Sequence, residues 1–249
     1  MSQARIRDTW LVRRHEAMAL GLLYALFTGV WFAAGWLLTR PLSDSWIVHT
    51  DQSISKWFVS RRTPTMNSLT FIGSMLSDTM VKIVVTSIVA IAMLIVWKRW
   101  LEPLVVVVAL ILEALTFITV TTLVGRSRPL TVAERLDTSP VGSSYPSGHM
   151  GAAVAYAAII VIVFWHTRRR WIRVIAAGVG VIIPLCVGFS RIYRGMHYLS
   201  DVIFGALLGG ASVIATVLVL RHAAQRQHMD EPSQPPETAE LTPVGSIGQ

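Results

Sequence analysis

The stretch SRIYRGMHYLSD, residues 190–201, decides how the rest of the chain is interpreted. It carries two arginines, Arg191 and Arg194, together with His197 and Asp201, and it lies between two strongly apolar runs. Charge costs free energy inside a bilayer, so ionisable groups at the edges of apolar segments often mark a substrate or ion site. The question is what these four side chains bind at the membrane surface.

The composition of the whole chain is that of a membrane protein. Of its 249 residues, 53% are hydrophobic and 14% are charged, and the mean hydropathy is +0.56. Six apolar runs are close to the roughly 20 residues that a transmembrane helix needs. They predict spans at about 17–38, 79–97, 101–123, 150–166, 172–189 and 200–220. We therefore expect an all-α integral membrane protein, a bundle of six transmembrane helices.

The basic residues predict the orientation of this bundle. The net charge is +8, but the arginines and lysines gather in short clusters beside the apolar runs, which argues against nucleic acid as a partner. Four clusters fall on one side of a six-span bundle: near the N-terminus, at 98–99, at 168–173 and after the last span. Cytoplasmic loops are enriched in Lys and Arg. This side is therefore predicted to be cytoplasmic, with both termini there, and the membrane to be the plasma (inner) membrane.

The same pattern divides the chain into three parts. Residues 1–16 are predicted to be a cytoplasmic N-terminus, residues 17–221 the six-helix membrane domain, and residues 222–249 a cytoplasmic tail. The tail is rich in Pro, Glu, Gln, Ser and Thr, so we expect it to be disordered. The extracytoplasmic loop 40–78 mixes aromatic and basic residues, which fits an interfacial amphipathic helix or an ordinary structured loop equally well.

Three features inside the spans concern packing. Gly205 and Gly209 have the small-xxx-small spacing that predicts close contact with another helix, within the chain or in a homodimer. Glu113 is expected to face the bundle and to pair with Lys82 or with a hydroxyl group. The single cysteine, Cys186, excludes a disulfide within the chain, and we expect it to be a small buried apolar residue.

Three polar clusters fall at the predicted extracytoplasmic ends of the spans. GRSRP, residues 125–129, follows the third span, and YPSGH, residues 145–149, begins the fourth. The stretch 190–201 joins the fifth span to the sixth. Because these ends lie on the same face of the bundle, the three clusters are expected to form one composite site.

The residue types in these clusters suit a phosphate group. Ser147 and Gly148 open a helix whose unpaired backbone N–H groups attract anions, and Gly148 lets a ligand oxygen approach the backbone closely. Arg128 and Arg191 add planar guanidinium groups that match phosphate oxygens. Each of these residues alone fits a headgroup anchor or a structural hydrogen bond as well, so the prediction rests on the combination.

Two histidines add groups that can form bonds and move protons. His197 and Asp201 are four residues apart, a spacing that places both on one face of a helix, so the carboxylate is predicted to orient the imidazole. An oriented His197 is a nucleophile or a base. His149 is a second group, able to protonate a leaving oxygen. The combination predicts phosphoryl transfer without a metal or another cofactor.

The order and spacing of these motifs are distinctive. They are Arg128-Pro129, then PSGH at 146–149, then Ser190-Arg191 followed by His197 and Asp201. They resemble the motifs of the type 2 phosphatidic acid phosphatase (PAP2) superfamily. The resemblance covers about residues 40–220 and implies the six-helix membrane fold of that superfamily, with its haloperoxidase-like core.

The resemblance also implies roles for individual residues. His197 is implied to attack phosphorus and form a phosphohistidine, Asp201 to orient His197, and His149 to protonate the leaving group. No metal and no cofactor are implied. The phosphate is implied to be held by Arg128, Ser147, Gly148 and Arg191.

One position departs from the family pattern. The first motif of the superfamily begins with a lysine seven residues before Arg128, and this chain has Thr121 there. Residues seven apart share a face of a helix, so Thr121 is expected to point toward the site without carrying a charge. Another cation is expected to replace the lysine. Arg126 is our first choice, with Arg194 and Lys82 as the alternatives.

The leading hypothesis is a lipid phosphatase, a hydrolase of phosphoric esters or, for a diphosphate, of an acid anhydride. A polyprenyl diphosphate such as undecaprenyl diphosphate is the favoured substrate, hydrolysed at the extracytoplasmic face in cell wall biogenesis. Phosphatidic acid and phosphatidylglycerol phosphate are alternatives within the same class. A weakly active lipid-binding or scaffold protein is an alternative of another class, because Thr121 lacks the motif charge. The expected partners are the lipid phosphate substrate and membrane lipids.

Overall fold

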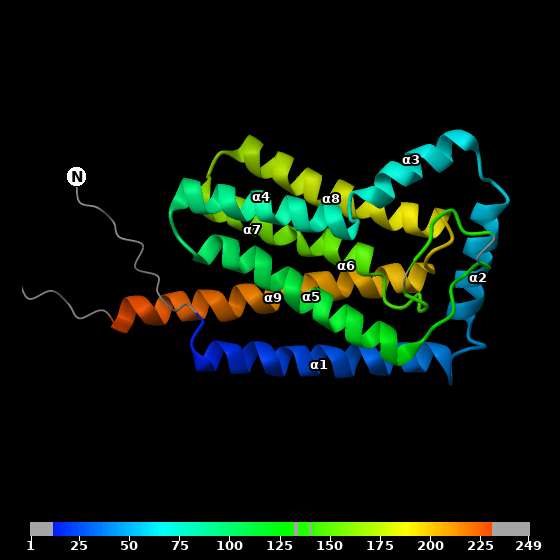
Figure 1. Ribbon diagram of the computed structural model, residues 1–249, viewed down its shortest axis with the longest axis horizontal. Coiled ribbons are helices and arrows are strands. Elements are labelled where there is room, and N and C mark those ends of the chain that lie inside the picture. Colours follow the sequence, from blue (N-terminus) through cyan, green and yellow to red (C-terminus); the bar gives the residue numbers. More distant parts are fainter. Residues whose placement is uncertain (1–11, 132–133, 140, 231–249) are drawn as a thin grey trace, which may run out of the picture.

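The computed structural model describes residues 12–131, 134–139 and 141–230. These residues form α-helices joined by turns and irregular segments, and the described part contains no β-strand (Figure 1). In chain order the helices are α1 (Arg14–Thr39), α2 (Trp46–Val59), α3 (Pro64–Met75), α4 (Thr79–Trp97), α5 (Leu101–Val124), α6 (Gly148–Ala155), α7 (Ala157–His166), α8 (Arg170–Tyr193) and α9 (Leu199–Asp230). The predicted all-α class is confirmed.

Six stretches of the described helices are long and apolar enough to cross a membrane. Five lie within single helices, α1, α4, α5, α8 and α9, and the sixth combines α6 and α7. The chain is thus a multi-pass membrane protein, as its six apolar runs predict. The fourth span differs from a single straight helix, because Tyr156 ends α6 and precedes α7.

The last helix is longer than the predicted sixth span. α9 continues past residue 221 to Asp230, so residues 222–230 of the predicted disordered tail are helical. The rest of that tail, residues 231–249, lies outside the described residues, as do residues 1–11 of the predicted N-terminal segment.

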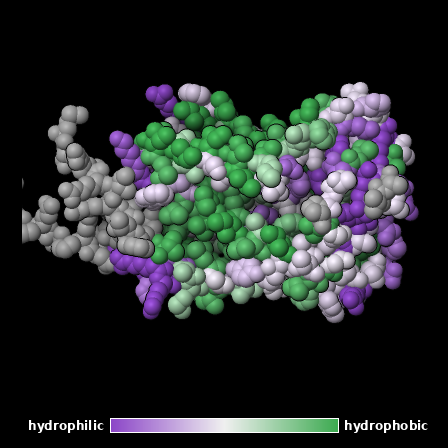
Figure 2. All heavy atoms as spheres, viewed as in Figure 1, coloured by the Kyte–Doolittle hydropathy of each residue, from purple (hydrophilic) through white to green (hydrophobic). Residues whose placement is uncertain are grey.

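The spans differ in how much of their surface the protein buries. In the spanning windows of α5, α6–α7 and α9, 44% of the residues are buried, against 6% for α4. α5, α6 and α9 therefore form the centre of the bundle, and α1, α4 and α8 lie around it. Apolar side chains cover the middle of the surface in Figure 2, and polar side chains gather at its ends. Cys186 is exposed on α8, so the expectation that it is buried is wrong.

α6 and α9 pack closely through glycine. A Cβ atom at Gly205 would collide with the carbonyl oxygen of Ser147, and one at Gly209 would collide with the carbonyl oxygen of Gly151. The predicted close contact is therefore made within the chain. Because these glycines are used inside the protomer, they give no reason to expect a homodimer.

The predicted loop 40–78 contains two short helices, α2 and α3, at one end of the bundle (Figure 1). α2 buries Asp51 and Ser55, and it exposes Trp46 and Trp57. It therefore brings two buried polar side chains to the bundle and carries two tryptophans among polar residues on its outer face, which suits a helix at the membrane interface that covers a polar site.

Candidate active site

The three polar clusters of the sequence meet at the end of the bundle where α2 and α3 lie. α5 ends at Gly125, whose left-handed backbone (φ 65°) lets the chain leave the helix just before Arg126. Gly195 (φ 74°) makes a second such turn, between α8 and His197. Backbone hydrogen bonds then join the clusters: Ser144 N donates to Arg126 O at 2.8 Å, and Ser147 N donates to Asp201 O at 3.0 Å.

His197 is buried in the turn between α8 and α9. Its Nδ1 lies 2.6 Å from the carbonyl oxygen of Ser144. Because a carbonyl oxygen can only accept, this contact fixes the tautomer: Nδ1 carries the hydrogen and donates it, and Nε2 keeps its lone pair. Burial and the charges of Arg191 and Arg128 lower the pKa of His197 well below its ordinary value of 6.5. The ring is therefore neutral, with Nε2 available as a nucleophile.

The predicted contact between His197 and Asp201 is not formed, and the described hydrogen bonds assign Asp201 other partners. The buried carboxylate accepts from Tyr198 N at 2.9 Å and from Arg126 Nη1 at 2.5 Å. The spacing rule fails because α9 begins after His197, so the two residues do not share a helix. Asp201 instead reaches back to the first turn of α9, as the acidic residue of a capping box does. It positions the segment beside His197 without touching the ring.

Arg126, our first candidate to replace the motif lysine, is already paired. Its Nη1 donates to Asp201 at 2.5 Å and to Ser200 Oγ at 2.7 Å, and its Nη2 donates to Asp51 at 2.9 Å. The guanidinium lies over the ring of Tyr198, 4.3 Å from its centre. Burial lowers the pKa of Arg126, but the two carboxylates outweigh this effect and raise it above its ordinary value. A guanidinium held between two carboxylates has its charge already balanced, which argues against Arg126 as the replacement for the motif lysine.

Two carboxylates outside the sequence motifs also hold the site, and sequence reasoning missed both. Asp51 of α2 pairs with Arg126 and accepts from Ser200 N at 3.0 Å. Asp137 accepts from Arg191 Nη1 at 3.0 Å and from Arg194 Nε and Nη2 at 2.7 and 2.6 Å. Burial raises the pKa of Asp137, but these contacts dominate and hold it below its ordinary value. An acidic residue in a loop carries no sequence signal that would reveal such a role.

The two arginines predicted to bind phosphate are held through their Nη groups. Arg128 donates from Nη1 to Met196 O at 2.6 Å and from Nη2 to two further backbone carbonyls at 3.0 Å. Arg191 donates from Nη1 to Ser74 Oγ at 2.7 Å. Within the described residues, the Nε of each arginine is buried without a hydrogen-bond partner. An unpaired buried donor is unfavourable, so a bound anion would stabilise both.

The start of α6 presents the third group of predicted site residues. Ser147 caps the helix, because its Oγ accepts from Met150 N at 3.4 Å, and its hydroxyl hydrogen stays free to donate. Gly148 is required by packing, since a Cβ atom there would lie 2.8 Å from the ring of Phe117. The ring of His149 is partly exposed and forms no hydrogen bond with the described residues. It is therefore free to meet a leaving-group oxygen.

Thr121 lies on the buried face of α5, as its spacing from the motif predicts. Its Oγ1 has no hydrogen-bond partner in the described part of the chain, and it supplies no charge. The unpaired Nε donors thus belong to Arg128 and Arg191, and the imidazole with a free Nε2 belongs to His197. Together with His149 they define a class: a multi-pass helical membrane protein with a cluster of arginines and histidines at one end of its bundle.

The comparison with protein families identifies the particular group. The sequence profile described as the PAP2 superfamily matches residues 102–224, which include all three motifs. The chain belongs to the PAP2 superfamily.

Two curated relatives match over shorter segments. Undecaprenyl-diphosphatase of Sulfolobus acidocaldarius is 35% identical over 74 residues, which are 30% of this chain and 32% of the relative. Phosphatidylglycerophosphatase B of Bacillus subtilis is 39% identical over 71 residues, which are 26% of this chain and 34% of the relative. The match thus spans about a third of the length of each relative.

Two crystal structures share the fold. A transmembrane PAP2-type phosphatidylglycerolphosphate phosphatase from Bacillus subtilis superposes with a TM-score of 0.57 at 20% identity, covering 88% of this chain and 100% of that one. Aquifex aeolicus LpxE superposes with a TM-score of 0.50 at 24% identity, covering 68% and 93%. At these identities the likeness concerns the fold, and it agrees with the predicted six-helix architecture.

Proposed function

We propose that this protein removes a phosphate from a lipid phosphate or lipid diphosphate through a phosphohistidine at His197. The observation that carries the proposal is the presentation of His197. Ser144 holds Nδ1, so Nε2 stays unprotonated. Arg128 and Arg191 lie close enough for their charges to act on the ring, and their buried Nε donors have no partner among the described residues. Membership of the PAP2 superfamily and similarity to two named phosphatases support the same activity.

The proposed reaction has two steps. Nε2 of His197 attacks phosphorus, the bond to the leaving oxygen breaks, and His149 donates a proton to that oxygen. A water molecule then gives a proton to His149 and attacks the phosphohistidine, which releases inorganic phosphate and restores both histidines. Arg128 and Arg191 stabilise the charge on the phosphoryl oxygens in each step.

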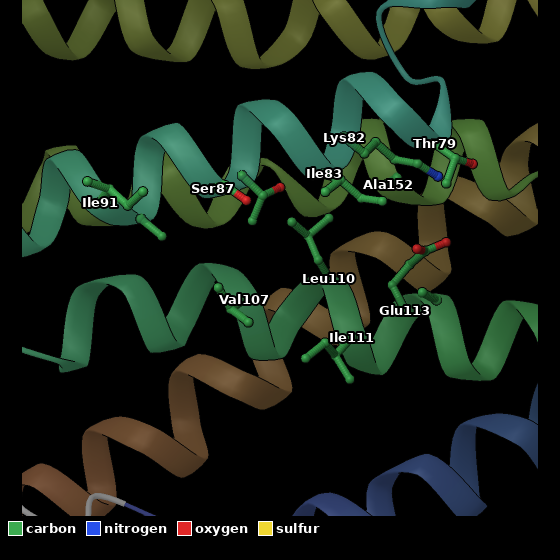
Figure 3. A pocket seen from close by; sticks show the side chains of 13 residues that line it. Thr79, Lys82, Ile83, Ser87, Ile91, Val107, Leu110, Ile111, Glu113 and Ala152 are labelled. Carbon is green, nitrogen blue, oxygen red and sulfur yellow. The ribbon is translucent and has the colours of Figure 1, made fainter.

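A cavity between α4 and α5 supports a lipid substrate (Figure 3). Its volume is about 530 Å³, and apolar side chains such as Ile83, Ile91 and Leu110 line most of it. Lys82 and Glu113 lie at its polar end. Because α4 and α5 are both membrane spans, we propose that an apolar lipid chain enters this cavity from the bilayer.

We propose a polyprenyl diphosphate as the first substrate to test. The relative named undecaprenyl-diphosphatase supports it, and the relative named phosphatidylglycerophosphatase B supports phosphatidylglycerol phosphate to the same degree. Phosphatidic acid is the third candidate substrate to test. The uncharged Thr121 favours a second class of function, a weakly active lipid-binding protein with the same fold.

We also propose that the site faces the extracytoplasmic side of the plasma (inner) membrane. The basic segments 98–99 and 168–173 lie at the end of the bundle opposite α2 and α3, and such segments favour the cytoplasm. An impermeant thiol reagent should label a cysteine introduced at the exposed Ser60, in a Cys186→Ala background, in intact cells. Labelling only after lysis would reverse the proposed orientation.

Phosphate release from the three lipids in detergent, with a chelator present, tests the function. Wild type should turn over at least one lipid, His197→Ala should not, and His49→Ala should match wild type because His49 is exposed on α2. Wild type given labelled lipid should retain acid-labile phosphate on His197. Absence of release from every lipid would favour the lipid-binding alternative. Loss of activity with the chelator would refute the metal-free mechanism.

A further inference from the structure

Thr121 leaves the site one positive charge short of the family pattern, and two of the three expected substitutes are already paired. Arg126 is held between Asp51 and Asp201. Arg194 is held by Asp137, which accepts from its Nε and Nη2 at 2.7 and 2.6 Å. The substitute that remains is Lys82 of α4.

The start of α4 is fixed beside the start of α6. Ser77, just before α4, donates to the carbonyl oxygen of His149 at 2.7 Å, and the hydroxyl of Tyr156 donates to the carbonyl oxygen of Lys82 at 3.1 Å. Side chains on an α-helix tilt toward its N-terminus. Figure 3 shows the ammonium group of Lys82 directed toward Thr79, at the site end of the helix.

The ammonium group of Lys82 forms no hydrogen bond and no ion pair within the described residues. Its charge interacts at longer range with Glu113, Asp78 and Arg191, and it also acts on His149. Hydrogen-bond donors that no side chain occupies are open to a ligand. The ammonium group of Lys82 can therefore donate to an anion that binds beside His149.

Glu113 faces Lys82 across the cavity (Figure 3). It is 2% exposed, and its Oε1 has no hydrogen-bond partner in the part of the chain that the structure describes. A Cβ atom at Gly151 would collide with that oxygen, so α6 fixes the carboxylate from behind. Glu113 thus faces Lys82 without forming a hydrogen bond to its ammonium group. The polar end of the cavity keeps a free donor for a ligand.

We propose that Lys82 binds the leaving-side phosphate of a lipid diphosphate and so selects diphosphates over monophosphate esters. The inference rests on the proposed phosphatase function. Ser77 joins the start of α4 to His149, and Lys82 lines the cavity proposed for the lipid chain, so all three lie on the side where the proposed acid His149 would meet the leaving group.

The chemistry explains the selectivity. When Nε2 of His197 bonds to the terminal phosphorus, the bond from that phosphorus to the bridging oxygen breaks, His149 donates its proton to the leaving group, and the leaving lipid phosphate still carries negative charge on its other oxygens. The ammonium group of Lys82 stabilises this anion. A monophosphate ester leaves as an alcohol once His149 has protonated it, so it gains much less from Lys82.

Paired kinetics on farnesyl diphosphate and phosphatidic acid test the proposal. Lys82→Met should lower kcat/KM for the diphosphate about 10- to 100-fold, the loss expected for one charge-assisted contact, and should lower it far less for phosphatidic acid. Lys82→Arg should retain most of the diphosphate rate. Lys56→Met, which removes an exposed lysine of α2, is the matched control and should behave as wild type on both lipids. Equal loss on both substrates, or no loss on either, would overturn the role of Lys82.

Two double variants separate phosphate binding from a structural role. Thr121→Lys should restore part of the diphosphate rate to Lys82→Met, because it returns a cation to the family position. Glu113→Gln should not restore it, whereas it would if Lys82 served only to neutralise Glu113. Restoration by Glu113→Gln alone would therefore refute the proposal.

Protection by pyrophosphate against thermal unfolding gives a readout that does not need turnover. It should raise the Tm of wild type more than that of Lys82→Met. A wild type that hydrolyses no lipid would overturn the proposed function, whereas equal protection of the two proteins would overturn the role of Lys82.

Discussion

Replacing Arg126 by Met tests whether this residue holds the fold of the site or binds the substrate. The change removes the guanidinium that joins Asp51 and Asp201, which are 2% and 0% exposed. Breaking a buried ion pair from one side costs about 3–5 kcal/mol, because the remaining charge stays buried without a partner. Two carboxylates lose their partner here, so we expect destabilisation at the upper end of that range.

A double-mutant cycle with Asp51→Asn assigns the effect to the ion pair. Asn has nearly the same shape and no charge, so Arg126→Met should cost less in that background. The coupling expected for contacting residues is about 0.5–3 kcal/mol. Reversible unfolding in mixed detergent micelles, followed by the fluorescence of the nine tryptophans, gives the four stabilities. Arg61→Met, at an exposed arginine of the same end, is the control and should stay within about 0.5 kcal/mol of wild type.

The opposite result would refute the reasoning. If Arg126→Met unfolds like wild type but no longer binds vanadate, a phosphate analogue, then Arg126 faces the substrate. Additive effects of Arg126→Met and Asp51→Asn would mean that the two side chains are not coupled in the folded protein.

Three further predictions follow from other contacts. Gly209→Ala should lower the free energy of unfolding by about 1–3 kcal/mol, because the added Cβ atom would collide with the backbone of Gly151. Gly21→Ala is the control and should not lower it, because the space around Gly21 is open. Thermal unfolding of the two variants measures the difference. The pKa of Asp137 is depressed below 3.8, so its ion pairs with Arg191 and Arg194 are complete above that pH and are lost as the pH falls through the lower folded-state value. The difference in Tm between wild type and Asp137→Asn should therefore stay constant from pH 8 to about 5 and shrink only in stronger acid. Because the pKa of His197 is lowered, the acid limb of kcat/KM due to the nucleophile should lie below pH 6.5, and a limb at or above 6.5 that shifts in Arg128→Met, which removes the charge, would contradict this.

Much of the fold follows from the sequence, because a bilayer makes strong demands on it. A span must be apolar over about 20 residues, so six apolar runs were sufficient to predict six spans. The interruption at Tyr156 and the extension of α9 to Asp230 were not predictable in this way. The hydropathy of the chain does not reveal either feature, because both depend on how neighbouring helices pack.

The partners inside the site were harder to predict than its members. The sequence places His197 near the other motif residues, but its Nδ1 partner is the backbone carbonyl of Ser144, and every residue has a carbonyl group. The pairing with Asp201 assumed that both residues share a helix. Because α9 begins only at Leu199, His197 is not part of the helix, and the four-residue spacing does not place it on the same face as Asp201.

The two arginines after α5 show why charge alone does not assign a role. Arg126 and Arg128 are two residues apart in a segment that has left the helix, so their side chains take different directions. One meets Asp51 and Asp201, and the other meets Met196 O at 2.6 Å. The carboxylates that capture Arg126 come from α2 and α9, far apart in the chain. The fold therefore neutralises Arg126 through two carboxylates, whereas the ammonium group of Lys82 forms no ion pair within the described residues, and this difference favours Lys82 as the replacement for the missing motif charge.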